Sequence, residues 1–353
     1  IKKIINEGGS VILMSHLGRP KKGPEDQYSL KHIIPNLQEK LGTEVKFSSD
    51  CIGVSALELS QTLGTGEVML LENVRFYPEE TKGDEDFASK LAKLGDIYVN
   101  DAFGTAHRAH ASTTIVAQFF EDKCAGYIMG SELANAKKVL ENPNRPFTAI
   151  MGGAKISDKI MIIEKLLDKV DHLIIGGGMS YTFSKAQGGA IGKSLCEDNR
   201  MALTLELIEK AKRKGVKLYL PIDNVIADDF NNDAHRQIVN AGEIPDDWEG
   251  LDIGPESINS FENIIKNSKT ILWNGPMGVF EFQNFAVGTE AIAEAVVTAT
   301  QNGAFSLIGG GDSAAAINNL GYGDKVSYVS TGGGALLEYM KGKTLPGVAI
   351  LED

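Results

Sequence analysis

The stretch Phe147-Thr148-Ala149-Ile150-Met151-Gly152-Gly153-Ala154-Lys155 is a short, mostly apolar run that ends directly in two glycines and a lysine. Such a run predicts a buried β-strand, and the glycines predict a tight turn into a following helix. Three further apolar runs end in the same way, at Ile175-Gly176-Gly177-Gly178, Ile308-Gly309-Gly310-Gly311 and Val329-Ser330-Thr331-Gly332-Gly333-Gly334. Repeated strand-turn-helix units are typical of a parallel sheet, so this half of the chain is predicted to be α/β.

The same alternation of short strands and helices extends over the whole chain. We expect strands in the first part at residues 11–15, 45–47, 68–71 and 97–100, and in the second part at 147–151, 172–175, 217–220, 270–273, 304–308 and 326–329. Residues 130–142 are helix-prone and are closed by Pro143 and Pro146, which predicts a connecting helix. The predicted fold is therefore two doubly wound parallel-sheet (Rossmann-like) domains joined by a helix.

Composition narrows the class of protein. The chain has 353 residues, of which 42% are hydrophobic and 23% charged, as expected for a globular protein of two domains. No apolar run is long enough for a membrane-spanning helix, and a formal charge of -12 disfavours nucleic acid and anionic lipid as partners. Three widely spaced cysteines without a CxxC pair indicate neither a disulfide framework nor a zinc site, and predict free thiols in a reducing cytoplasm.

The glycine turns predict a site for phosphate. In a parallel sheet these turns emerge at one edge, where glycine lets backbone N–H groups approach an anion closely. Tight turns without a ligand are the alternative for each cluster. Residues 309–314 fit the G-x-G-x-x-A dinucleotide pattern, but no acid ends the following strand and Asp312 would repel a pyrophosphate. A Mg²⁺ ion held by Asp312 and a nucleotide resolves this conflict, while a helix N-cap is the alternative role for Asp312.

Two lysines follow the first glycine turn. Lys155 and Lys159 are four residues apart at the start of a helix predicted over 156–170, and would share one face of it. Cations near a helix N-terminus interact unfavourably with the helix dipole, and a bound phosphate would compensate for this repulsion. Scattered surface lysines are the alternative. Residues 188–194 resemble a P-loop, but only three residues separate the glycines and the run follows a helix instead of a strand.

Basic residues gather at the ends of three predicted strands in the first part. They are His16, Arg19 and Lys21 after the first strand, Arg75 after the third, and His107, Arg108 and His110 after the fourth. The arginine between the two histidines would repel a metal ion, so an anion fits better. An exposed basic loop, and a pair between Arg75 and Glu72, are the alternatives. The guanidinium fork matches phosphate and carboxylate oxygens, so three strand ends offer arginine to one small anion.

An anion site in one half and a nucleotide-phosphate site in the other indicate phosphoryl transfer. The motifs that carry this interpretation are His16-Leu17-Gly18-Arg19-Pro20, Glu72-Asn73-Val74-Arg75-Phe76, Phe103-Gly104-Thr105-Ala106-His107-Arg108, Gly152-Gly153-Ala154-Lys155, Asp252-Ile253-Gly254-Pro255-Glu256-Ser257, Trp273-Asn274-Gly275-Pro276, Gly309-Gly310-Gly311-Asp312-Ser313 and Ser330-Thr331-Gly332-Gly333-Gly334. In this order they resemble phosphoglycerate kinase over nearly the whole chain. The resemblance implies hinge-bending closure of a cleft and the reversible glycolytic reaction of 1,3-bisphosphoglycerate and ADP to 3-phosphoglycerate and ATP.

The resemblance also implies roles for individual residues. It assigns phosphoglycerate binding to His16, Leu17, Gly18, Arg19, Arg75 and Arg108. It assigns nucleotide binding to Gly153, Lys159, Gly250, Asn274, Pro276, Glu281 at the ribose, and Gly310, Gly311, Asp312 and Ser313. Lys155 and the amides of Gly333 and Gly334 would stabilise the transferring phosphoryl group, and Asp312 would hold Mg²⁺. No general base is required, because a carboxylate nucleophile is already ionised at neutral pH.

The resemblance implies boundaries as well. We expect a phosphoglycerate-binding domain over 1–127, an interdomain helix and linker over 128–145, a nucleotide-binding domain over 146–330, and a hinge with a C-terminal segment returning to the first domain over 331–353. The family's opening strand, with its Asp-Phe-Asn motif, would precede Ile1, so a truncated record is expected. A cytoplasmic monomer is expected. Two alternatives stay open, a nucleotide-binding module inactive through that truncation and an NAD-dependent oxidoreductase.

Overall fold

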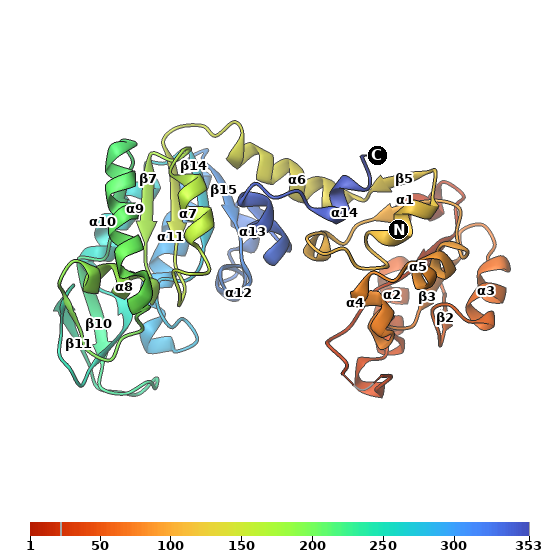
Figure 1. The fold of residues 1–353 in the computed structure, drawn as a ribbon, viewed down its shortest axis with the longest axis horizontal. Helices are drawn as coiled ribbons and strands as arrows, with labels where there is room; N and C mark the ends of the chain where they lie inside the picture. Colours follow the sequence, from red (N-terminus) through yellow and green to blue (C-terminus); the bar gives the residue numbers. More distant parts are fainter. Residues whose placement is uncertain (22, 353) are drawn as a thin grey trace. The chain divides into compact units, whose positions relative to one another are not determined.

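The computed structural model describes residues 1–21 and 23–352. The chain divides into two compact units, each with its own hydrophobic core (Figure 1). Residues 1–130 and the segment from Thr344 onward form the first unit, and Ser131–Lys343 form the second. Both units combine helices with parallel strands, which confirms the predicted α/β class.

A six-stranded parallel sheet forms the centre of the second unit, in the order β16-β15-β14-β6-β7-β9. The strands are β6 (Phe147–Met151), β7 (His172–Ile175), β9 (Lys217–Tyr219), β14 (Thr270–Asn274), β15 (Phe305–Ile308) and β16 (Tyr328–Val329). Every residue of the adjacent strands β6 and β14 is buried. A strand covered on both faces needs a continuous apolar run, which explains why the sequence predicts these strands so clearly.

Helices pack against this sheet and complete the core of the second unit (Figure 1). Trp273 of β14 is fully buried in one cluster with Phe261 of α10 and Ile292 of α11. Helix α6 begins in the first unit and continues into the second. The helices are α6 (Tyr127–Leu140), α7 (Ile160–Leu166), α8 (Met179–Ala186), α9 (Met201–Arg213), α10 (Pro255–Lys266), α11 (Val287–Gln301), α12 (Gly311–Asn319) and α13 (Gly334–Met340), with 3₁₀ turns η6 (Asp198–Arg200), η7 (Gln283–Phe285) and η8 (Gly323–Lys325).

Two small sheets in the second unit were not predicted. An antiparallel sheet has the order β11-β10-β13, and a parallel pair joins β12 to β8. Their strands are β8 (Ala190–Ile191), β10 (Asp223–Ala227), β11 (Arg236–Asn240), β12 (Glu243–Ile244) and β13 (Glu249–Ile253). Most of β11 is exposed and β10 begins with two polar residues, so neither strand shows a clear apolar pattern.

The first unit contains two parallel sheets, β1-β3-β2 and β4-β5. The strands are β1 (Val11–Leu13), β2 (Val45–Ser48), β3 (Val68–Leu71), β4 (Tyr98–Asn100) and β5 (Lys123–Ala125). Its helices are α1 (Lys2–Asn6), α2 (Ile34–Leu41), α3 (Val54–Gln61), α4 (Pro78–Lys82), α5 (Glu85–Ala92) and α14 (Pro346–Ala349), with 3₁₀ turns η1 (Asp26–Tyr28), η2 (Leu30–Ile33), η3 (Val74–Phe76), η4 (Phe103–Thr105) and η5 (Ile115–Phe119). The C-terminal segment joins this unit through hydrogen bonds of Gly347 to Ala106 and Asn100.

The structure corrects the predicted extent of one helix. The helix predicted over 156–170 is only α7, and residues 156–159 form a turn ahead of it. Residues 331–343 belong to the second unit, and the segment that joins the first unit begins at Thr344, within the range expected to hold the hinge and the returning segment. Ser330 and Thr331 are held in the second unit by Glu132 of α6, whose carboxylate accepts hydrogen bonds from both residues.

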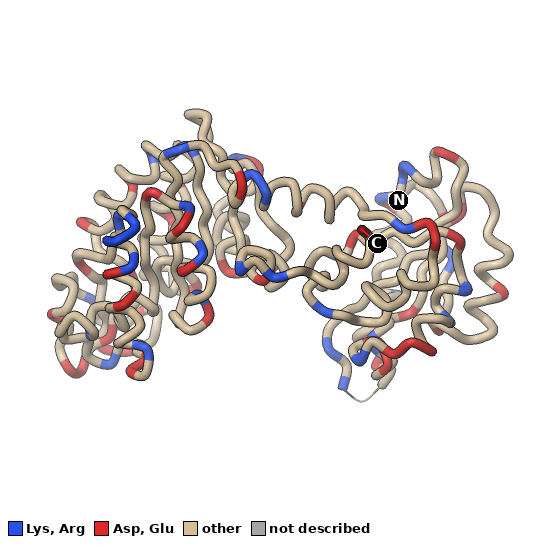
Figure 2. Tube along the Cα trace, turned by 45° about the horizontal axis from the view of Figure 1, so that its top comes forward, with Lys and Arg blue, Asp and Glu red and all other residues tan. Residues whose placement is uncertain are grey.

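Charged residues of both signs occur throughout both units. Figure 2 shows Lys and Arg interspersed with Asp and Glu along both units. Among the described residues, no helix is both long and apolar enough to cross a bilayer.

Candidate active site

Three loops of the first unit bring its basic residues together. The backbone N–H of Val74 donates to Ser15 O at 3.1 Å, and Asn73 Nδ2 donates to Leu17 O at 2.8 Å. Arg75 Nη1 donates to Gly18 O at 3.2 Å. The loop after β1 is therefore fixed to the turn η3 that carries Arg75.

Electrostatics shows that the cations of these loops are close to one another. The pKa of His16 is lowered to about 4, first by desolvation and then by the charges of Arg75, His110 and Arg19, although the residue is partly open to solvent. Desolvation also lowers the pKa of Arg75, with further contributions from Arg108 and Arg19. His16, Arg19, Arg75 and Arg108 thus form one positive cluster in which His16 is neutral at pH 7.

The conformation of the loop that carries His16 and Arg19 requires glycine at position 18. Its φ is +64°, and a Cβ at this position would lie 2.5 Å from the Tyr28 ring. A larger residue would push the loop away from Tyr28 and from Arg75. The loop therefore presents His16 and Arg19 in a conformation that depends on glycine.

In the second unit, backbone hydrogen bonds link the glycine turns at the carboxyl ends of the sheet. Gly152 N donates to Asn274 O at 3.0 Å, and Gly153 N donates to Pro276 O at 2.9 Å. Ser313 Oγ accepts a hydrogen bond from Gly275 N. A Cβ at Gly152 or Gly275 would lie within about 2.2 Å of the facing backbone, so only glycine permits this close approach.

Asn274 is the most unusual polar residue of these turns. It is only 1% exposed, and neither Oδ1 nor Nδ2 has a hydrogen-bond partner among the described residues. Gly310 lies beside it, where a Cβ would approach Nδ2 to 2.9 Å. Buried amides are nearly always paired, so this side chain indicates a partner from outside the protein, such as a ligand or an ordered water.

Lys155 and Lys159 do not share a helix face. Lys155 is exposed in the turn after β6, and Lys159 is the N-cap residue of α7. Burial lowers the pKa of Lys159 to about 8, while the charge of Asp312 opposes this shift. Asp312 itself is exposed in the first turn of α12. The expected alignment was wrong because the chain turns before the helix begins, yet Lys159 and Asp312 are brought close together.

The remaining predicted residues of the second unit lie around the same turns or beside them. Gly250 lies in β13, where its N–H donates to Ser194 Oγ at 2.8 Å. Glu281 is exposed in the turn ahead of η7. Gly333, with φ +48°, is the N-cap residue of α13, and Gly334 is the first residue of that helix. The amides of Gly333 and Gly334 therefore stand at a helix N-terminus, where an anion is favoured.

Comparisons with known proteins decide the family. The family model described as phosphoglycerate kinase matches residues 1–343. The chain belongs to the phosphoglycerate kinase family. It is 53% identical to the phosphoglycerate kinase of Porphyromonas gingivalis over 377 residues, which cover 100% of this chain and 90% of that protein. It is 54% identical to the cytosolic phosphoglycerate kinase of Nicotiana tabacum, with 100% of this chain and 88% of that protein covered.

Solved structures of phosphoglycerate kinases agree with the fold. The structure from Coxiella burnetii has a TM-score of 0.89 and 42% identity, and the match covers 99% of this chain and 88% of that chain. The structure from Pyrococcus horikoshii has a TM-score of 0.80 and 29% identity with the same coverage. The chain is therefore a glycolytic phosphotransferase that acts on a carboxyl group, using phosphoglycerate and ADP or ATP as substrates. Neither the oxidoreductase nor the inactive nucleotide-binding module is favoured.

Sequence reasoning missed two buried residues that support the candidate phosphoglycerate kinase site. Glu80, 2% exposed, accepts hydrogen bonds from Ser112 N and Ser112 Oγ, and its charge acts on Arg75. Tyr181 of α8 packs so closely on Gly250 that a Cβ there would lie 2.1 Å from its hydroxyl. The Glu80–Ser112 and Tyr181–Gly250 contacts each join residues more than 30 positions apart, so no local sequence pattern predicts them.

Proposed function

We propose that the first unit binds phosphoglycerate through His16, Arg19, Arg75 and Arg108, with the backbone of Leu17 and Gly18 shaping the site. The linked loops and the mutual effects of these cations support this assignment. In a chain with a formal charge of -12, an anionic ligand needs such a local excess of positive charge. The arginine forks suit its carboxylate and phosphate, and neutral His16 offers a hydrogen bond.

We propose that the second unit binds the nucleotide at the carboxyl ends of its central sheet. The residues involved are Gly153, Lys159, Gly250, Asn274, Pro276, Glu281, Gly310, Gly311, Asp312 and Ser313. The observation that carries this proposal is the buried Asn274 amide, which has no partner among the described residues. A nucleotide oxygen would accept a hydrogen bond from its NH₂ group and remove the penalty of leaving it unpaired.

The residues around Asp312 fit a Mg²⁺ ion bound with the nucleotide. The carboxylate of Asp312 is exposed and makes no hydrogen bond or ion pair with the described residues, apart from its attraction to Lys159. Mg²⁺ usually takes one or two carboxylates and completes its shell with phosphates and water, so no larger cluster of protein ligands is required. When bound, the ion neutralises charge on the phosphates. Asp312 would hold it in place.

For transfer, the carboxylate oxygen of phosphoglycerate forms a bond to the γ-phosphorus of ATP as the bond to the β-phosphate oxygen breaks. In the opposite direction ADP attacks the acyl phosphate. The protein aligns the reactants and stabilises charge on the moving group, since no proton must be removed from the nucleophile. Lys155 and the amides of Gly333 and Gly334 would make these contacts, and the exposure of Lys155 leaves its ammonium free to do so.

Lys155→Ala tests this assignment. We expect kcat to fall by about 10²–10³-fold with a small change in KM, because the contact strengthens in the transition state. A coupled assay that follows ATP formation from 1,3-bisphosphoglycerate measures both constants. Lys212→Ala, which removes an exposed lysine of α9, is the matched control and should retain full activity. An unchanged kcat in Lys155→Ala would refute the catalytic role.

We infer that the enzyme works as a monomer in the cytoplasm and does not bind nucleic acid or membranes. The high negative charge and the three free cysteines support this inference. The monomeric state follows from the family resemblance alone. Sedimentation equilibrium at several protein concentrations tests it, and a mass that rises with concentration would contradict it.

A further inference from the structure

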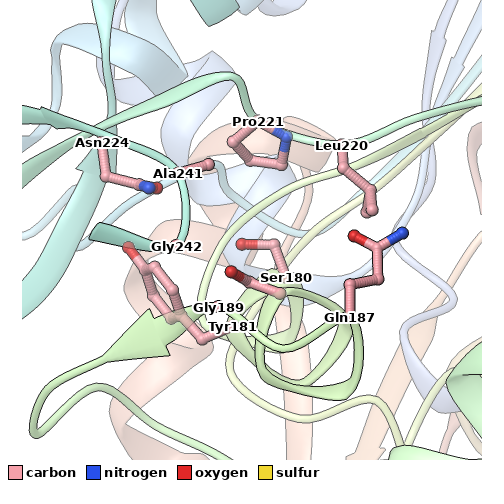
Figure 3. Close-up of a pocket in the computed structure, with 10 residues that line it drawn as sticks. Ser180, Tyr181, Gln187, Gly189, Leu220, Pro221, Asn224, Ala241 and Gly242 are labelled. Carbon is pink, nitrogen blue, oxygen red and sulfur yellow. The ribbon is translucent and has the colours of Figure 1, made fainter. Parts of the chain in front are cut away.

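A small pocket lies in the second unit between helix α8 and residues that precede β10, begin β10 and follow β11 (Figure 3). Its volume is about 180 Å³. Ser180, Tyr181 and Ser184 line it from α8, and Leu220, Asn224 and Gly242 line it from the opposite side. Figure 3 shows the amide groups of Asn224 and Gln187 at opposite ends of the pocket, with Ser180 between them. None of these residues belongs to the nucleotide site proposed above.

Asn224 shows that the pocket is suited to a polar ligand. The residue is 3% exposed and lines the pocket, and its side-chain amide makes no hydrogen bond to the described residues but reaches the solvent of the pocket. Water pairs with this amide when the pocket holds no ligand, and a polar ligand can replace that water and keep the hydrogen bonds. Burial raises the pKa of the Tyr181 hydroxyl, which therefore remains a neutral donor. The pocket thus offers hydroxyl and amide groups that include both donors and acceptors.

The lining also sets the charge and size of the ligand. None of the ten lining residues is Asp, Glu, Lys, Arg or His, so a charged molecule would lose hydration without gaining a counter-charge. An apolar molecule would displace water from hydroxyl and amide groups without replacing its hydrogen bonds. A volume of 180 Å³ has room for several water molecules or for one small molecule. A neutral compound of three to five carbons with several hydroxyl groups matches these limits.

The pocket is connected to the candidate nucleotide turns through α8. Ser180 Oγ donates to Gly177 O at 2.7 Å, in the glycine turn that precedes the helix. Tyr181, its neighbour, packs on Gly250 with no room for a Cβ between them. A molecule that contacts Ser180 and Tyr181 therefore touches the residues that position Gly177 and Gly250.

We propose that this pocket is a second ligand site, which takes a small uncharged polyol and alters the affinity of the second unit for its nucleotide. The coupling step rests on the proposed nucleotide site, whereas polyol binding does not.

Erythritol is a suitable probe, and NMR of the isotopically labelled full chain is the first measurement. We expect the side-chain amide signal of Gln187 to shift in a saturable way on titration. Asn224→Ala removes the amide that lines the pocket, and Ala241→Leu fills the pocket without removing a polar group, so both should weaken erythritol at least about tenfold. Gln237→Ala, which removes an exposed amide of β11 outside the pocket, should leave the affinity unchanged. Sucrose, which is too large for the pocket, should give no saturable shift.

Shifts that do not saturate, or that are equal in Asn224→Ala, Ala241→Leu and the unaltered chain, would mean that the pocket holds only water and would overturn the proposal. The second measurement is calorimetry of Mg-ADP with and without saturating erythritol. We expect the Kd of Mg-ADP to change at least about threefold, and saturating Mg-ADP to change the Kd of erythritol by the same factor. An unchanged Kd would refute the coupling. Failure of Mg-ADP to bind would refute the proposed function and leave the erythritol titration intact.

Discussion

We expect nucleotide affinity at the candidate site to depend on pH through the protonation state of Lys159. Its ammonium lies near Asp312 and Lys341, and burial lowers its pKa to about 8. A bound polyphosphate favours the charged form and so raises this pKa. Above pH 8 the free enzyme must take up a proton to bind nucleotide, and the affinity for Mg-ADP should fall by up to about tenfold per pH unit.

Lys159→Arg removes this titration, because arginine stays charged throughout the range. Calorimetry between pH 7 and 9.5 should therefore show a falling affinity for the unaltered chain and a nearly constant affinity for the variant. Parallel pH profiles for the two proteins would show that Lys159 does not contact the nucleotide.

At this scale, the sequence predicted which polar residues lie at or just beyond the carboxyl ends of strands. Arg75 and Asn274 follow apolar runs, and the topology of a parallel sheet determines the edge at which they emerge. Glu80 and Tyr181 were missed because their importance comes from partners such as Ser112 and Gly250, far away along the chain. The unpaired state of Asn274 is likewise a property of packing that no motif contains.

Helix α10 depends on a residue of a different element. Asp223 of β10 is 3% exposed, and its carboxylate accepts hydrogen bonds from Glu256 N, Ser257 N and Ser257 Oγ at 3.0, 2.8 and 2.6 Å. It thereby caps the first turn of α10, whose own N-cap residue, Gly254, has no side chain for this purpose.

Asp223→Ala leaves the N–H and the hydroxyl of buried Ser257 without this acceptor and uncaps the N–H of Glu256, so it should lower the free energy of unfolding by about 2 kcal/mol. Both tryptophans, Trp248 and Trp273, lie in the second unit, so their fluorescence during urea unfolding reports on this unit. Asp246→Ala removes an exposed carboxylate from the same unit and should have little effect. Equal midpoints for the two variants would contradict the capping role.

Strands were predicted well where every residue of the strand is buried. Strands β6 and β14 are covered on both faces and read as continuous apolar runs. Strand β11 is mostly exposed and was missed. The helix expected from residue 156 begins only at Ile160, because the chain first makes a turn stabilised by the hydrogen bond from Lys159 N to Ile156 O.

At the scale of the whole molecule, the candidate sites of the two units differ in the chemical groups that they offer. Arginine and histidine side chains gather in the first unit, whereas glycine turns, helix N-termini and an unpaired amide gather in the second. Length and the proline-closed helix predicted two units, since each sheet needs a core of its own. The chain returns to the first unit at Thr344, and Gly347 then contacts Asn100 and Ala106. The sequence alone does not reveal these contacts.

In the proposed arrangement, each of the two substrates binds to a different unit. Calorimetric titration of 3-phosphoglycerate and of Mg-ADP into Arg19→Ala and Asp312→Asn tests it most directly, with Lys40→Ala as a control for the loss of an exposed charge from α2. We predict that Arg19→Ala weakens 3-phosphoglycerate at least about tenfold, or about 1.4 kcal/mol, and leaves Mg-ADP unchanged. Asp312→Asn should do the opposite. Equal weakening of both ligands by either variant would contradict the assignment of one substrate to each unit.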